Sequence, residues 1–415
     1  MRIALACEAE PGERRSPLTP FDVRSLVACG LDVVIEASDK RVFRNEEYAG
    51  VGATLCARAE KVDILFAIKN PGPRDTVKAY AFFTHSSKGQ SGARESLEQY
   101  REQGSSIVDY ELLTNRDGRR RIGFGLEAGR AAVIDALREV GIRRRDNGCL
   151  SPYSDLNPSD QYETWNSAAG ALARCEENGA TPPLTLLLGS GNVARGARDA
   201  LSLGGVAPTV WGPERIFRRK DGARGRRSDL IENPEQYFSR VEAIAGRFEL
   251  IINGAYWCPG YPPFLTNAWL EKRVRNRESY PAVLADVSYD VPGPIEFNVG
   301  GHRWEKRAYV WDALKSRPCT PGSRRGPVVV GVPNWPSAFA REASSRFSTE
   351  LTLIVRELRD AFGPSGWCPN RLPKWILPAL VLCEGVLTAP DPTRVTTWTQ
   401  SSIRASSFSL VPERA

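Results

Sequence analysis

One of the two histidines in this 415-residue chain directly follows an apolar run. It is His85, in the stretch AYAFFTHSSKGQ at 79–90, and Lys88 follows it after two serines. A histidine titrates near neutral pH without help, and burial or a cationic neighbour can bring a lysine into that range. The stretch could supply an acid–base group, or it could be the ordinary polar end of a strand.

Lys69 is a second candidate, because it ends the apolar stretch VDILFAIK just before the loop residues NPGP. Lysines at strand ends usually only reach solvent. If both stretches are parallel strands of one sheet, however, Lys69 and His85 end at the same edge, where open α/β sheets bind ligands. That shared edge is the reason to consider the two side chains together.

The strongest local motif is a glycine turn between a strand and a helix, LLLGSGNVARGARDAL. Gly189 permits the tight turn, Gly191 lets the backbone approach a pyrophosphate, and Ala194 is small enough for close helix packing. The free N–H groups of the helix start would bind the phosphates. The alternative is a tight turn without a ligand. We predict dinucleotide contacts from Gly189, Ser190, Gly191, Asn192 and Val193.

The kind of dinucleotide depends on the end of the next strand, TVWGPERIFRRK. Gly212 stands where such folds usually place the acid that binds the adenosine ribose. Arg215 and Arg218 follow and would suit a 2′-phosphate, so NADP(H) is favoured over NAD(H). The alternative is a solvated basic loop in which Glu214 binds the ribose.

Strands and helices alternate along the chain, which predicts an α/β fold with parallel sheets. In the first series we expect strands at 2–7, 32–37, 62–69, 79–85 and 105–113, and helices ending at Gly30, at 45–52 and at 93–104. In the second we expect strands at 183–191, 207–212, 248–256 and 282–289, and helices at 162–179 and 192–205. Residues 143–160 read as a loop.

Two long amphipathic stretches, 126–142 and 337–363, are expected to be crossover helices between two Rossmann-like domains. Residues 1–130 with 330–415 should form a substrate domain, and residues 131–329 a dinucleotide domain. We expect the active site in the cleft between them, at the carboxyl edges of both sheets.

The composition of the chain limits the classes of partner that we expect. Hydrophobic residues make up 41% and charged residues 25% of the chain, and the net charge is +7. The sequence has no apolar run of transmembrane length and no signal-peptide pattern, and its nine scattered cysteines lack zinc-ligand spacing. We therefore expect a cytoplasmic protein without a metal, a membrane or nucleic acid as partner. Anionic small molecules are the favoured ligands.

Several motifs occur together in the order seen in one family. They include ERRSPLTP, DILFAIKNPGP, AFFTHSSKGQ, VDYELL, GSGNVARGA, LADVSYD and REASSRFSTEL. The chain resembles the lysine-ketoglutarate reductase, or lysine-forming saccharopine dehydrogenase, family, a branch of the alanine dehydrogenase and transhydrogenase superfamily. The resemblance runs from about residue 2 to about residue 390 and implies a reversible, nicotinamide-dependent reductive amination. An amine would condense with a 2-oxo acid, and hydride would reduce the imine.

The resemblance also implies roles for individual residues. Lys69 and His85 match the family's acid–base pair, and Glu111 matches a carboxylate that tunes this pair. Substrate carboxylates would be held by Arg15, Lys88 and Arg120. Asp290 matches an aspartate that lies near the nicotinamide in the alanine dehydrogenases.

Each assignment has a rival. Neighbouring arginines compete with Arg15 and with Arg120, and Glu111 could merely pair with an arginine. His302 has no motif support, and we interpret it as structural.

Three departures from the family pattern bear on the substrate. Asn70 replaces an acid after Lys69, Ser87 replaces a histidine-like position, and Pro333, in PNWP, replaces an aspartate. The resemblance implies lysine and 2-oxoglutarate as the substrates, or a variant amine in a specialised pathway. A lysine ε-amine is cationic, so the loss of acids weakens the case for lysine itself and a different amine could be joined to the 2-oxo acid. Two further readings stay open: an ammonia-using enzyme like the alanine dehydrogenases, and a catalytically silent NADP(H) sensor. The chain is expected to be a monomer or a small homo-oligomer.

Overall fold

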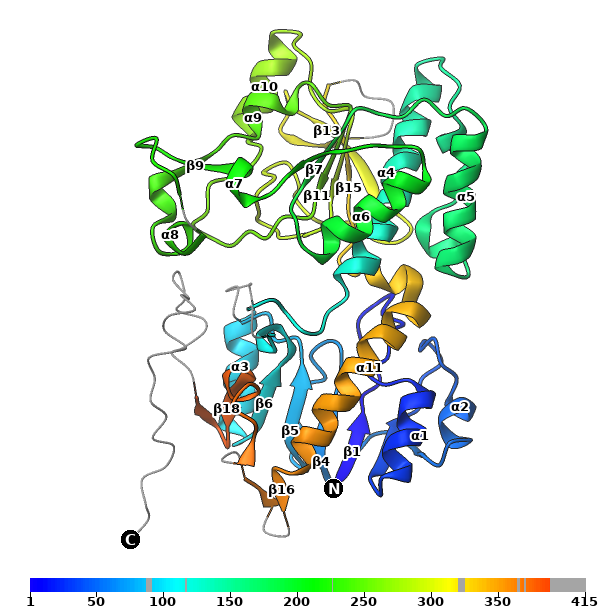
Figure 1. The fold of residues 1–415 in the computed structure, drawn as a ribbon, viewed down its shortest axis with the longest axis vertical. Coiled ribbons are helices and arrows are strands. Elements are labelled where there is room, and N and C mark those ends of the chain that lie inside the picture. The colour runs from blue at the N-terminus through cyan, green and yellow to red at the C-terminus, as the bar shows by residue number, and fades with distance from the viewer. Residues whose placement is uncertain are drawn as a thin grey trace. The chain divides into compact units, whose positions relative to one another are not determined.

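The computed structural model describes residues 1–86, 92–115, 118–225, 227–319, 325–363, 366–368 and 371–388. The chain divides into two compact units. The first contains Met1–Gly123 together with the chain from Ala340 onward, and the second contains Phe124–Phe339. Their boundaries lie near the predicted residues 130 and 330. In Figure 1 the first unit runs from blue to cyan and then orange, and the second from cyan to yellow.

The first unit is built on a largely parallel sheet. Within the described residues its strand order is β19-β18-β6-β5-β4-β1-β2-β3. The strands are β1 Arg2–Leu5, β2 Asp32–Glu36, β3 Thr54–Cys56, β4 Val62–Phe66, β5 Val77–Phe82, β6 Ser106–Asp109, β18 Leu380–Cys383 and β19 Val386–Leu387. Strands β1 to β6 pair in parallel, whereas β18 pairs antiparallel with β6. Buried apolar runs such as Ile64, Leu65 and Phe66 explain the parallel sheet, because both of its faces are covered.

Helices cover this sheet. They are α1 Pro20–Ala28, α2 Asn45–Ala49, α3 Ala93–Glu102 and α11 Ala340–Arg359. Thr19 caps α1, its side-chain oxygen accepting the N–H of Asp22. The helix ends before Gly30, whose φ of 82° suits glycine. The apolar face of α11 is buried, and Ser348 on that helix accepts the backbone N–H of Thr19. Helix α11 thus packs onto the start of the chain within one unit.

The second unit has a second, mainly parallel sheet. Its order within the described residues is β14-β13-β15-β12-β11-β7-β8. These strands are β7 Thr185–Leu188, β8 Thr209–Trp211, β11 Leu250–Asn253, β12 Val283–Asp286, β13 Ala308–Asp312, β14 Arg317–Cys319 and β15 Val328–Val330. Strands β13 and β14 pair antiparallel at one edge. Two small antiparallel pairs lie outside the large sheets. In the second unit β9 Phe217–Arg219 pairs with β10 Tyr237–Ser239, and in the first unit β16 Phe362–Gly363 pairs with β17 Gly366–Trp367.

The helices of the second unit are α4 Gly125–Asp146, α5 Trp165–Glu177, α6 Asn192–Leu203, α7 Pro213–Ile216, α8 Arg227–Glu232, α9 Glu242–Ala245 and α10 Asn267–Arg275. Helices α4 and α6 cross at glycines. A Cβ atom on Gly196 would lie 1.9 Å from the carbonyl oxygen of Leu126, and one on Gly129 would lie 2.1 Å from that of Val193. These glycines let α4 pack closely against α6, the helix that follows the glycine turn.

The expected α/β class with two largely parallel sheets is confirmed. The predicted loop at 143–160 is wrong at its start, because α4 continues to Asp146. Arginines are good helix formers and are favoured in a last turn, and Arg144 also binds Glu249 there. Among the helices that the structure describes, none combines the length and the apolar character needed to span a bilayer.

Candidate active site

Polar residues follow the carboxyl ends of four adjacent parallel strands of the first unit. In sheet order these strands are β1, β4, β5 and β6. Glu8, Lys69 and His85 each follow the last residue of β1, β4 or β5 by three positions, and Glu111 follows β6 by two. Neighbouring strands lie about 4.8 Å apart, so this carboxyl edge gathers the four side chains. The pairing of β4 with β5 confirms that Lys69 and His85 leave neighbouring parallel strands.

His85 is held in an unusual backbone conformation. Its φ is 55°, in the left-handed region that few residues other than glycine adopt. The imidazole stacks against the ring of Phe83, with 6.3 Å between centroids and 15° between planes. Its Nδ1 atom lies 3.5 Å from Oε1 of Glu111, and the side chain is 36% exposed. The ring is thus oriented on one side and open on another, as an acid–base group requires.

Glu111 connects His85 to Arg120. The Nη2 atom of Arg120 donates a hydrogen bond of 3.0 Å to the same Oε1 of Glu111. Its guanidinium also lies 5.9 Å from the centroid of the Phe83 ring. Arg121 points elsewhere, because it pairs with Glu350 and lies over Trp375. Of these two arginines, Arg120 is the one beside the predicted site.

Asp109 was missed by the sequence analysis, although it lies in the quoted motif VDYELL. Its carboxylate accepts the hydroxyl of Thr84 at 2.6 Å and the N–H of Glu111 at 2.8 Å, with a longer contact of 3.4 Å from the N–H of Thr84. Burial, helped by the charge of Glu111, raises the pKa of Asp109 to about 6. This one carboxylate therefore organises the turns that carry both His85 and Glu111. An acid as the last residue of a buried strand was the available signal.

The loop from Lys69 to Arg74 is fixed at several points. Its start is held by Glu8, whose carboxylate accepts the backbone N–H of Lys69 at 3.0 Å. Asn70 Oδ1 accepts the hydroxyl of Tyr100 at 2.6 Å and the N–H of Gly72 at 2.9 Å, and Asn70 Nδ2 donates to Ser96 at 2.8 Å. The ammonium of Lys69 makes no hydrogen bond or ion pair within the part of the chain that the structure describes. The backbone of Lys69, by contrast, is held by the Glu8 carboxylate.

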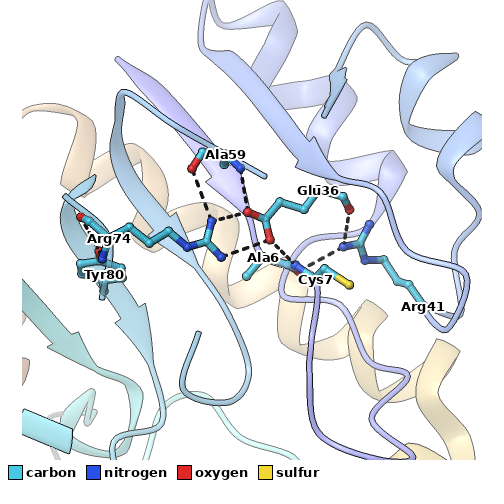
Figure 2. A network of polar contacts seen from close by, with 7 residues as sticks. All are labelled: Ala6, Cys7, Glu36, Arg41, Ala59, Arg74 and Tyr80. Atoms are coloured by element: carbon cyan, nitrogen blue, oxygen red, sulfur yellow. Dashed lines mark hydrogen bonds and ion pairs between the residues drawn. The ribbon is translucent and has the colours of Figure 1, made fainter. Parts of the chain in front are cut away.

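The other end of this loop is held by Arg74, as Figure 2 shows. Its guanidinium binds the carboxylate of Glu36, which also accepts the N–H groups of Cys7 at 2.8 Å and Ala59 at 2.7 Å. Burial raises the pKa of Glu36, but the bonds from Arg74 and the two N–H groups outweigh it, and the net pKa is lowered. Arg41 completes the network by donating to the carbonyls of Ala6 and Glu36. Glu36, the last residue of β2, thus stays ionised and connects the loops after β1, β3 and β4.

Arg15 is buried beside Glu13, whereas Arg14 is exposed. Glu13 accepts the Nε of Arg15 at 2.7 Å and its Nη2 at 2.5 Å, a two-point ion pair between side chains that are 0% and 5% exposed. Its burial distinguishes Arg15 from its neighbour in the sequence. Lys88 and Ser87 lie outside the described residues.

In the second unit the glycine turn has the geometry that a dinucleotide needs. Gly189 has a φ of 110°, and a Cβ there would lie 2.7 Å from the carbonyl oxygen of Gly254. Gly191 precedes α6, and a Cβ there would meet no atom within 4 Å. Ser190, Gly191 and Asn192 are exposed, and Val193 packs against Gly254. Space is therefore open beside Gly191 at the N-terminus of α6, where the free N–H groups of a helix start could bind a pyrophosphate.

Near the end of β8 the carboxylate comes from Glu214, and not from position 212, where such folds usually place the acid. Gly212 has no side chain, but the oxygens of Glu214 lie 2.6 and 2.8 Å from where its Cβ would be. Glu214 therefore occupies the space beside Gly212. Arg215 and Arg218 are exposed.

Asp290 lies near a buried polar network at the end of β11 and β12. Asp286 accepts Nδ2 of Asn253 at 2.9 Å and Nδ2 of Asn298 at 2.8 Å, and burial raises its pKa. The charge of Asp290, itself 8% exposed, raises the pKa of Asp286 further. His302 is structural, as interpreted from the sequence: its ring lies 3.3 Å from both the Tyr289 hydroxyl and the Val329 carbonyl. Burial lowers its pKa to about 4, so it stays neutral.

Two other features lie away from these residues. A hollow of about 650 Å³ opens at the amino edge of the first sheet, lined by Val62, Val77 and Ser106 among others, and none of the predicted site residues lines it. Within the described residues no group of three or more His, Cys, Asp or Glu could hold a metal ion. Pro333, in place of the family's aspartate, is exposed.

Comparisons with known proteins bear on the resemblance. Residues 4–131 match the family described as alanine dehydrogenase/PNT, N-terminal domain. The chain is 27% identical over 402 residues to the mitochondrial alpha-aminoadipic semialdehyde synthase of Bos taurus, covering 85% of this chain and 43% of that protein. It thus spans less than half the length of that relative. It is 26% identical to the NAD(+), L-lysine-forming saccharopine dehydrogenase of Yarrowia lipolytica, covering 86% of this chain and 92% of that protein.

The fold has a solved counterpart. An L-alanine dehydrogenase structure superposes with a TM-score of 0.61 at 19% identity, covering 94% of this chain and 98% of that chain. The two largely parallel sheets are therefore of the alanine dehydrogenase type. Together these findings confirm the resemblance: over most of its length the chain is similar to lysine-forming saccharopine dehydrogenases, and its residues 4–131 match the alanine dehydrogenase/PNT N-terminal family.

Proposed function

We propose that the protein is a nicotinamide-dependent oxidoreductase that joins an amine to a 2-oxo acid. One observation supports it best: Lys69 and His85 follow the ends of adjacent parallel strands, and Oε1 of Glu111 lies 3.5 Å from Nδ1 of His85. Amine and carbonyl would condense to an imine with loss of water, and one hydride and one proton would then give a secondary amine. Bound nicotinamide supplies the hydride.

The side chains have separate tasks in this proposal. Lys69 and His85 transfer the protons of condensation and reduction, because an amine and an imidazole can each give and take a proton. Arg15, Arg120 and Lys88 bind substrate carboxylates, and Glu111 orients His85. Asp290 would lie by the nicotinamide, and the glycine turn before α6 would bind the pyrophosphate.

The amine is proposed to differ from lysine. The amide of Asn70, where relatives of this kind usually have an acid, is engaged with Tyr100, Gly72 and Ser96 and carries no charge. A cationic amine substrate would therefore meet one negative charge fewer beside Lys69 than it would in those relatives. Asn70 supports the stability of the Lys69 loop instead.

The preference between NADP(H) and NAD(H) depends on the end of β8. Exposed Arg215 and Arg218 and the bare Gly212 support NADP(H), which we keep as the proposed cofactor. The carboxylate of Glu214 beside Gly212 supports NAD(H), because it could accept both ribose hydroxyls and would repel a 2′-phosphate.

The test is oxidation of NADPH and of NADH with 2-oxoglutarate and a panel of lysine, ornithine, arginine and ammonia. Turnover with an amino acid supports the proposal and identifies the amine. Turnover with ammonia alone would indicate an enzyme of the alanine dehydrogenase kind. Tight cofactor binding without turnover for any pair would indicate a silent sensor.

A further inference from the structure

Glu8 connects the loop after β1 to the loop that carries Lys69. Its Oε1 atom accepts the N–H of Ile68 at 2.6 Å, and its Oε2 atom accepts the N–H of Lys69 at 3.0 Å. The residue is 7% exposed and lies 60 positions before Ile68 in the sequence. Each oxygen of one carboxylate thus holds one of two consecutive backbone donors.

These two donors need such an acceptor because the ladder between β1 and β4 has ended. The register pairs Leu5 with Phe66, and the last backbone bond on this side runs from the N–H of Ala6 to the carbonyl of Phe66. On the other side, the N–H of Ala67 still donates to Ala81. The carboxylate of Glu8 therefore replaces the strand carbonyls that β1 no longer supplies.

We propose that Glu8 is a positioning residue for Lys69: it fixes the backbone from which the lysine side chain projects toward the substrate. This inference rests on the acid–base role proposed for Lys69. Because the loop is held at its far end by Arg74 and Glu36, the Glu8 contact completes a segment that is fixed at both ends. A reacting amine displaced by about 1 Å can lose about a hundredfold in rate, so such fixation matters for catalysis.

The charge of Glu8 changes in the range where the enzyme would work. Burial, with a contribution from Glu13, raises the pKa of Glu8 to about 7, while the two N–H groups and Arg15 oppose the rise. Burial raises the pKa of the Tyr110 hydroxyl, and the charge of Glu8 contributes to that rise. The ionised carboxylate is the form that accepts both N–H groups fully, so the contact is complete above this pKa.

The experiment compares the full-length wild type with Glu8→Gln and with a matched control, Asp312→Asn. Asp312 is also buried, and its Oδ1 accepts the N–H groups of Leu314 and Lys315 at 3.1 and 3.2 Å, in the second unit. Steady-state kcat and KM are measured, together with amide hydrogen exchange in the segment around Ile68 and Lys69.

Glu8→Gln should lower kcat by about ten- to a hundredfold, leave KM for the cofactor within about twofold, and speed exchange at these amides. Asp312→Asn should lower the melting temperature while kcat and this exchange stay unchanged. Unaltered kcat or unaltered exchange in Glu8→Gln would overturn the inference. Absence of turnover in the wild type would instead overturn the proposed function and the catalytic importance of Glu8, and exchange would still decide whether Glu8 holds this backbone.

Discussion

The Nδ1 atom of His85 lies 3.5 Å from the Oε1 atom of Glu111. A buried carboxylate at this place can fix the orientation of the ring and balance the positive charge that appears when the ring takes a proton. The same oxygen also accepts a hydrogen bond from Arg120, so in the proposed function the arginine that binds substrate and the histidine that transfers protons would share one carboxylate. His85 is therefore set between an orienting group and open space.

Replacement of His85 by asparagine should abolish most of the activity. Loss of a general acid–base group typically costs about a hundred- to ten-thousandfold in kcat. Steady-state assays with the best amine and 2-oxo acid would measure it, and a loss below about tenfold would remove His85 from the mechanism.

The only other histidine provides the control. His302 is buried between Tyr289 and the carbonyl of Val329. His302→Asn should lower the melting temperature, because a buried hydrogen-bonded ring is lost, and should change kcat by no more than about twofold. A large loss of kcat in a folded His302→Asn protein would contradict the structural role.

Replacement of two helical glycines of the second unit by alanine should change the free energy of unfolding in opposite directions. In Gly196→Ala the new methyl group would meet the backbone of Leu126 at 1.9 Å, so α4 and α6 must separate, at a cost of about 1–3 kcal/mol or more. In Gly170→Ala, within α5, the nearest atom is the flexible Arg174 guanidinium at 3.4 Å, and a gain of about 0.5–1 kcal/mol is expected. Urea unfolding of both variants measures the free energies. Equal stabilities would contradict the close helix crossing.

Much of the fold could be predicted because the local signals are strong. Buried apolar runs, helix ends at residues such as Gly30, and the strand–glycine–helix pattern around Gly189 all lie within short stretches of sequence. The antiparallel additions β13, β14 and β18 were not predicted. Strand β18 joins the sheet through pairing with β6, more than 270 residues earlier, and no short window of sequence contains that information.

The site shows the same division. Lys69 and His85 end two predicted strands, so the edge that they share could be inferred, and Glu111 lies within a third predicted strand. Glu8 and Asp109 were not assigned, because their importance lies in the donors that they accept: two backbone N–H groups for Glu8, and the Thr84 hydroxyl with the Glu111 N–H for Asp109. Glu214 was named only as the alternative ribose ligand, because its place beside Gly212 depends on the direction of a side chain.

Glu214→Gln should shift the cofactor preference toward NADPH. Its carboxylate lies beside Gly212, where it would repel a 2′-phosphate and accept ribose hydroxyls. Removal of the charge should raise the ratio of kcat/KM for NADPH over NADH by about tenfold, and Arg215→Gln should lower the same ratio. A ratio that stays constant in Glu214→Gln would show that this carboxylate does not reach the ribose.

The stability of the protein should depend on pH through Glu8. The folded state raises the pKa of this group from 4.5 to about 7, so between these pH values the folded chain binds a proton that the unfolded chain has released. The resulting stabilisation is fully present below about pH 4.5 and is lost as the pH rises through 7. At about 1.4 kcal/mol for each pH unit, the loss amounts to about 3 kcal/mol. In the Glu8→Gln variant this side chain cannot titrate, whereas the other carboxylates with raised pKa values remain, such as Asp109 with its pKa of about 6. Urea unfolding at pH 5 and pH 8 should therefore show a steeper decline for the wild type than for Glu8→Gln, and an equal decline would mean that Glu8 is ionised throughout.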